Sequence, residues 1–157
     1  MPAIHLSIPQ IQQQQPGECL AACAQMILTH LSLQVAYERL LKLLQVRSGY
    51  GTPASNIRYL ETLDLVVRYQ SLGTFEDLYD NLSQGQPCIA FIKAGELPYW
   101  EENVNHAVVV VGLDDQFIYF NDPAFPTAPV QIARQEFDLA WLEWDEKYVV
   151  VTPRTEA

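Results

Sequence analysis

The chain has 157 residues, which suits one domain spanning residues 1–157, and 49% of them are hydrophobic, enough to bury a core. A mean hydropathy near zero argues against membrane and disordered proteins, and no apolar run approaches the about 20 residues that span a bilayer. With 19 acidic and 9 basic residues the formal charge is −10, so nucleic acid, which needs a basic surface, is not expected as a partner.

The cysteine content and the first residues indicate where the protein works. The opening MPAIHLSIP lacks the basic head and apolar middle of a secretory signal, so we expect a cytoplasmic protein. Three cysteines are too few, and odd in number, for a disulfide framework. Cys19 and Cys23 form a C-x3-C pair, but no second pair of Cys or His follows at finger-like spacing. We therefore expect a reduced compartment, no metal and no cofactor.

Helices are expected mainly in the first half of the chain. A short edge strand at 3–9 and a polar turn ending in Pro16-Gly17 come first. Helical composition and periodicity then predict three helices, at 19–31, at 34–46, and from a Thr52 cap with Pro53 in the first turn to about Leu63.

Strands dominate the second half. The expected elements are a strand at 64–70, a short helix at 75–82 capped by Thr74, a buried strand at 87–93, a loop at 94–104, two strands at 106–113 and 116–122 joined by Asp114-Asp115, a proline-rich loop at 123–129, a helix at 134–144 and a last strand at 147–153. The β-branched run at 106–113 predicts a strand covered on both faces. This order predicts an α+β fold, with an N-terminal helical half packed on a C-terminal, mainly antiparallel sheet.

Cys19 is the one cysteine with a turn before it and a helix after it. Free N–H groups and the helix dipole favour negative charge at such a position, and a thiol there can become a nucleophilic thiolate. The alternative is a small buried hydrophobe, which is the interpretation we give Cys23 and Cys88. The adjacent Glu18 counts against activation unless its side chain points away or accepts a hydrogen bond.

A histidine and a carboxylate face each other across the predicted hairpin. Counting outward from Asp114-Asp115 brings His106 opposite Asp122, or nearly so, with Cβ atoms about 4.5–5.5 Å apart. His106, Val108, Val110 and Gly112 are then expected on one face, matched by Asp122, Phe120 and Ile118. A carboxylate there fixes the tautomer and leaves the other ring nitrogen as a base. A slip of one residue would place Asn121 opposite instead, on the other face.

Acyl transfer also needs donors for an oxyanion. The backbone N–H of Cys19 is one candidate, and an amide from the glutamine run at 12–15 is another, although that run alone could be a polar loop.

These residues together resemble papain-like cysteine peptidases, and among them the bacteriocin-processing, double-glycine leader peptidase family. The shared features are a Gln six residues before a Cys that opens an Ala-rich helix, the strand Asn105-His106-Ala107-Val108 reaching Gly112, the return motif Asn121-Asp122-Pro123, and the tail 136–141 before a Val-rich strand. The resemblance covers about residues 8–151. It implies a papain-like fold in which Cys19 is the nucleophile, His106 the base, Asp122 its orienter and Gln13 the oxyanion donor.

The expected activity is therefore hydrolysis of a peptide or amide bond in a peptide or protein substrate. Two departures leave alternatives open. The family usually has Asp-Cys-Gly where this chain has Glu18-Cys19-Leu20, and no exporter segment follows. A catalytically quiet peptide-binding module, or a deamidase or acyltransferase with the same triad, therefore stays possible. The loop 94–104, with Tyr99, Trp100 and two glutamates, either walls the cleft or packs on the core. The sequence leaves the substrate and the oligomeric state open.

Overall fold

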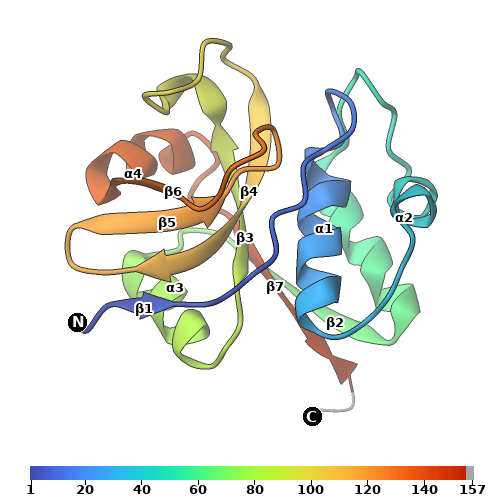
Figure 1. Cartoon of the computed structure of the whole chain (residues 1–157), viewed down its shortest axis with the longest axis horizontal. Coiled ribbons are helices and arrows are strands. Elements are labelled where there is room, and N and C mark those ends of the chain that lie inside the picture. The colour runs from blue at the N-terminus through green and yellow to red at the C-terminus, as the bar shows by residue number, and fades with distance from the viewer. Residues whose placement is uncertain (155–157) are drawn as a thin grey trace.

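Three helices lie together on one side of the computed structural model, which describes residues 1–154. They are α1 (Cys19–His30), α2 (Tyr37–Leu43) and the 3-10 helix η1 (Ala54–Leu63). Figure 1 shows them beside a seven-stranded sheet that carries two more helices, α3 (Phe75–Ser83) and α4 (Arg134–Leu142). The expected α+β fold, a helical half packed on an antiparallel sheet, is confirmed.

All strand pairs in the sheet are antiparallel. The strands are β1 (Ile4–His5), β2 (Leu65–Gln70), β3 (Cys88–Lys93), β4 (Asn105–Leu113), β5 (Phe117–Asn121), β6 (Val130–Ala133) and β7 (Tyr148–Pro153). The order is β2-β7-β3-β4-β5-β6, and β1 pairs with the end of β4, beyond the stretch that β3 occupies. A short 3-10 turn, η2 (Ala94–Glu96), follows β3.

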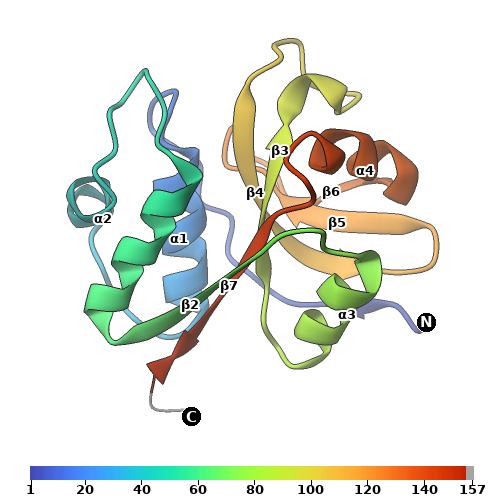
Figure 2. The same cartoon turned by 180° about the vertical axis from the view of Figure 1, so that it is seen from behind.

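The central strands separate two hydrophobic cores. Ala107 and Val109 of β4 face α1, α2 and η1, whereas Val108 and Val110 face α3 and α4. Figure 2 shows the two sets of helices on opposite sides of β3 and β4. Because side chains alternate along a strand, a run of four valines can fill both cores, and the prediction of a strand covered on both faces is confirmed.

Local signals for helix ends were partly correct. Thr74 forms the expected cap of α3, where its side chain and that of Asp77 each bond the other's backbone N–H. The cap expected at Thr52 is wrong, since Pro53 holds the capping position and Thr52 Oγ1 is buried without a partner among the described residues. Strand β6 was not predicted, because its four residues follow a proline-rich loop and are too few to carry a clear alternation.

The hairpin register differs from the prediction by two residues. Val109 pairs with Asn121 and Val110 with Phe120, so His106 and Asp122 are not directly opposite. A bulge between Val110 and Gly112 adds one residue to β4 near the turn and moves Gly112 off the expected face. On the His106 side of the bulge the shift of two keeps side chains on their expected faces, so His106 and Asp122 still lie on the same side of the sheet.

Candidate active site

Cys19 is the first residue of α1 and stands half-buried at the wall of a cleft between the helical side and the sheet. The expected helix start is confirmed. No side chain among residues 1–154 caps this helix, so its first N–H groups face the cleft end without a capping partner. Cys23 and Cys88 are fully buried, as expected, and burial raises the pKa of Cys88 to about 12.

Glu18 points away from the thiol. It is buried, and its Oε1 accepts hydrogen bonds from the Tyr37 hydroxyl at 2.9 Å and the Gln15 N–H at 3.2 Å. Its Oε2 accepts one from the Ser48 hydroxyl at 2.5 Å. The carboxylate is therefore satisfied by neutral donors of the helical side, which answers the objection raised by its place in the sequence.

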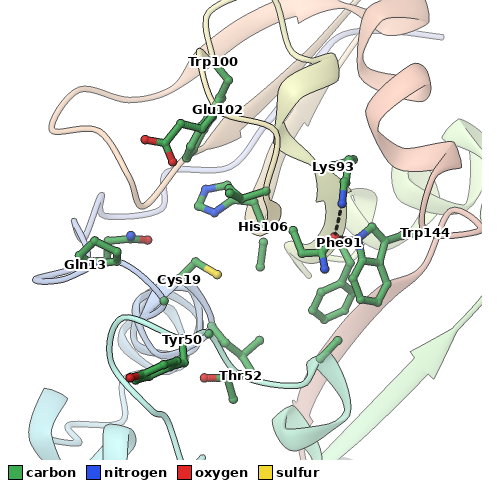
Figure 3. A pocket seen from close by; sticks show the side chains of 18 of the residues that line it. Gln13, Cys19, Tyr50, Thr52, Phe91, Lys93, Trp100, Glu102, His106 and Trp144 are labelled. Carbon is green, nitrogen blue, oxygen red and sulfur yellow. Dashed lines mark hydrogen bonds between the residues drawn. The ribbon is translucent and has the colours of Figure 1, made fainter.

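His106 and Asp122 form a buried pair. The Nε2 atom of His106, near the start of β4, lies 2.7 Å from Asp122 Oδ1, just beyond the end of β5. Since Nε2 is occupied by the carboxylate, Nδ1 is the ring nitrogen left for Cys19. Figure 3 shows the ring of His106 facing Cys19, with Gln13 to one side of the two.

Asp122 has a complete set of hydrogen-bond donors. Its Oδ2 accepts from the Tyr99 hydroxyl at 2.6 Å and the Trp100 indole N–H at 2.9 Å. Its Oδ1 accepts from the Ala124 N–H at 3.0 Å in addition to His106. A fully buried carboxylate with four donors can stay charged despite its burial.

The contact between His106 and Asp122 favours the charged form of each: the pKa of His106 is raised and that of Asp122 is lowered. Burial lowers the pKa of His106, but hydrogen bonds with Asp122 and with Cys19 outweigh it and raise the pKa to about 9. Burial raises the pKa of Asp122, and the hydrogen bond and charge of His106 lower it to a net value below the ordinary one. A raised pKa favours the imidazolium form of His106, and a positive charge next to a thiol favours the thiolate.

Gln13 lines the same cleft as Cys19 and His106. Its backbone N–H is bonded to the Pro123 carbonyl at 2.7 Å, which ties it to the segment that follows Asp122. Its Oε1 is buried without a partner among the described residues, while the side chain lines the cleft. In Figure 3 its amide points toward Cys19 and His106. Gln10 ties the same segment to the N-terminal part of the chain, donating to the Asp122 and Phe125 carbonyls.

The cleft around these side chains has a volume of about 1060 Å³. Five aromatic side chains line it on the sheet side. The loop 94–104 does line the cleft, and its Tyr99 and Trp100 also pack against the core, so both expectations hold. Among the residues that sequence reasoning did not assign to the cleft are Tyr50, Phe91, Lys93, Asn105 and Trp144. They lie in four separate segments without a shared motif, so only the fold brings them together.

The described residues offer little for other kinds of chemistry. Within residues 1–154 no group of three or more His, Cys, Asp or Glu could hold a metal ion. None of the helices in that range is long and apolar enough to cross a membrane. What the cleft does assemble is a thiol, an imidazole bonded to a carboxylate, and an amide, the set that nucleophilic acyl transfer uses.

Comparisons with known proteins identify the family and the fold of the chain. A model of the Peptidase C39-like family matches residues 5–148. Among solved structures, a protein described as a C39-like peptidase from Bacillus anthracis is 18% identical, with a TM-score of 0.80 and coverage of 98% of this chain and 99% of that one. No curated protein sequence matches the chain.

Two further structures have the same fold. A double glycine motif protease from an AMS/PCAT transporter, in complex with a leader peptide, is 23% identical, with a TM-score of 0.71 over 95% of this chain and 94% of that one. The peptidase domain of Streptococcus ComA, a bi-functional ABC transporter, is 17% identical, with a TM-score of 0.76 over 94% and 99%. The papain-like architecture expected from the sequence is thereby confirmed.

Proposed function

This chain belongs to the Peptidase C39-like family, and from that membership and the cleft geometry we propose that it is a cysteine peptidase whose nucleophile is Cys19. The observation that carries the proposal is the buried His106–Asp122 pair, with Nε2 and Oδ1 2.7 Å apart, in the same cleft as a cysteine at a helix start. A structural core has no need of an imidazole bonded on one side and turned to a thiol on the other.

The proposed reaction has two halves. The Cys19 thiolate attacks the peptide carbonyl, and the backbone N–H of Cys19 and the Gln13 amide stabilise the oxyanion. The His106 imidazolium then gives its Nδ1 proton to the leaving amine as the C–N bond breaks. In the second half neutral His106 removes a proton from water, the hydroxide attacks the thioester, and the thiolate leaves as the acid forms.

A peptide is the proposed substrate. One relative of the same fold was solved with a leader peptide bound. In this chain both Cys19 and Trp144 line the same cleft. A deamidase or acyltransferase would share the first half of the reaction, because the group that attacks the acyl-enzyme is set by access to the site. These activities, and quiet peptide binding, are separate outcomes of the test.

The test joins a chemical probe with a search for turnover. We expect iodoacetamide to alkylate Cys19 at pH 7 at least tenfold faster in the wild type than in His106→Ala, because the imidazolium stabilises the thiolate. We also expect the wild type, and not Cys19→Ala, to cleave members of a peptide library, read by mass spectrometry. Gln13→Ala should cleave about 10²–10³-fold more slowly while its Cys19 is alkylated at the wild-type rate.

Equal alkylation of Cys19 in the wild type and His106→Ala would contradict the proposal. Fast alkylation without cleavage, together with peptide binding that survives Cys19→Ala, would replace the peptidase by a binding module. Loss of ammonia from glutamine or asparagine side chains, detected as a mass change without chain cleavage, would replace it by a deamidase.

A further inference from the structure

The carboxylate of Asp122 is held from the side opposite His106 by a loop that precedes β4. Tyr99 and Trp100 donate to Oδ2 at 2.6 and 2.9 Å, while Oδ1 faces His106. We propose that Tyr99 and Trp100 are positioning residues, which fix the orientation of Asp122 and keep it charged so that it can hold the His106 ring. This inference rests on the proposed function and extends it to two residues that do not touch the reacting atoms.

Burial makes these donors necessary. Asp122 is fully buried, and without donors a buried carboxyl prefers its neutral form, which carries no charge to hold an imidazolium. The ionisable groups that face it are His106 from β4, Tyr99 from the loop, and Cys23 from α1, beneath Cys19. His106 supplies one hydrogen bond to the carboxylate. The remaining stabilisation of its negative charge comes from the two donors at Oδ2 and from the Ala124 N–H.

Tyr99 is suited to this role because it stays a donor. Burial in the first place, and then the charge and hydrogen bond of Asp122, raise the pKa of Tyr99 far above its usual value. The hydroxyl therefore keeps its proton throughout the range in which a cysteine peptidase works. An indole N–H, as in Trp100, cannot be lost at all under these conditions.

Aromatic packing holds the donors and the acceptor as one unit. The ring centroids of Trp100 and His106 lie 4.8 Å apart. Tyr99 and Trp100 also contact Phe125, three residues beyond Asp122, at 5.3 and 5.5 Å between centroids. The loop thus grips both the carboxylate and the segment that carries it, an arrangement that plain core filling does not require.

Tyr99→Phe and Trp100→Phe remove one donor each and keep an aromatic ring. The matched control is Tyr119→Phe, which removes a similar hydroxyl-to-carboxylate bond, 2.9 Å from Asp114 Oδ2, on the same hairpin and away from the cleft. The measurements are the rate of Cys19 alkylation by iodoacetamide against pH, and kcat and KM for a cleaved peptide. Thermal unfolding followed by circular dichroism checks the fold.

We expect the pH at which alkylation of Cys19 and kcat fall to half on the acid side to rise by about one unit in Tyr99→Phe. The reason is that Asp122, with one donor fewer, takes up a proton more readily. At pH 7 we expect kcat to fall about tenfold with KM within about twofold of the wild type, because a hydrogen bond to a charged group is lost. Tyr99 and Trp100 both line the cleft, but Tyr99→Phe keeps the ring that forms the wall, whereas Trp100→Phe makes it smaller, so Trp100→Phe should change both kcat and KM. Tyr119→Phe should match the wild type.

The role through Asp122 is checked in the Asp122→Asn background, where Tyr99→Phe should add less than about twofold. Unchanged acid-side midpoints in both Phe variants, with a normal wild-type profile, would overturn the positioning role and leave the proposed function intact. A wild-type Cys19 without enhanced reactivity would overturn the proposed function itself. If neither variant folds, the wild-type Trp100 indole proton decides, since the proposal requires its NMR shift to follow the titration of Asp122.

Discussion

Two buried carboxylates lie beside the cleft, and they have opposite surroundings. Glu18, on the helical side, accepts hydrogen bonds only from neutral groups: two hydroxyls and a backbone N–H. Asp122, on the sheet side, accepts from a hydroxyl, an indole and a backbone N–H, but also from the ring of His106. Both are buried, and Glu18 accepts three hydrogen bonds where Asp122 accepts four, so burial and hydrogen-bond count alone do not tell a structural acid from a functional one.

The difference lies in what each acid is connected to. Glu18 joins the start of α1 to Tyr37 and Ser48, 19 and 30 residues along the chain, and so fixes the loops around Cys19. Asp122 joins β5 to a group that titrates and that faces the thiol. We infer that Glu18 holds the backbone of Cys19 in place and that Asp122 controls the protonation of His106.

The largest expected effect is that of Asp122→Asn on turnover. An asparagine keeps the volume but supplies no charge to hold the imidazolium, so we expect kcat for a cleaved peptide to fall about 10³–10⁴-fold. The control is Asp114→Asn, which removes a carboxylate from the turn of the same hairpin, outside the cleft. A loss of less than tenfold in Asp122→Asn, or an equal loss in Asp114→Asn, would contradict the distinction.

The pH dependence of stability should show the same asymmetry. His106 has a pKa of about 9 in the folded protein and 6.5 as its ordinary value, so its contribution is fully present below pH 6.5 and is lost as pH rises toward 9. Between pH 6 and 8.5 we expect the free energy of unfolding to fall by an amount on the order of 2 kcal/mol. Urea unfolding across this range measures it.

The matched variant for that measurement is Asp122→Asn. Burial alone would lower the pKa of His106, and the hydrogen bond with Asp122 contributes most to raising it, so the fall in stability should shrink to less than half in the variant. An unchanged slope would mean that another group titrates. Cysteines of the unfolded chain ionise near about pH 8.5 and add to the fall, but they do so equally in both proteins, so only the difference between the two slopes is assigned to His106.

Much of the fold was predictable because its signals are local. Pro16-Gly17 before an Ala-rich run marked the start of α1, and Thr74 three residues before Asp77 marked that of α3. The valine run of β4 predicted burial on both faces. Strand β6 was not predicted, because it has only four residues. The bulge near Gly112 was not predicted either, because an extra residue does not change the pattern of a run of uniformly apolar side chains.

The placement of a side chain at the candidate site could be predicted where strand alternation or a motif indicated it. It could not be predicted where it depends on contacts between distant segments. The expected register was off by two residues, yet the even shift kept His106 and Asp122 on one face. The hydrogen bonds from Tyr99 and Trp100 to Asp122 could not be predicted from the sequence, because a loop has no periodicity that shows where its side chains point. The direction of Glu18 depended equally on a tyrosine and a serine from distant segments.

The smallest expected effect is that of Glu18→Gln. The amide keeps acceptor capacity for the Tyr37 hydroxyl but loses the charge, so we expect about 1 kcal/mol of lost stability, measured by urea unfolding. Turnover at pH 7 should change less than about threefold, because the backbone of Cys19 stays in place and His106 keeps its partner. Glu61→Gln, an exposed acid of η1, controls for net charge. A loss of turnover as large as that of Asp122→Asn would mean that Glu18 also governs the thiol, and the two acids would then share one function instead of dividing it.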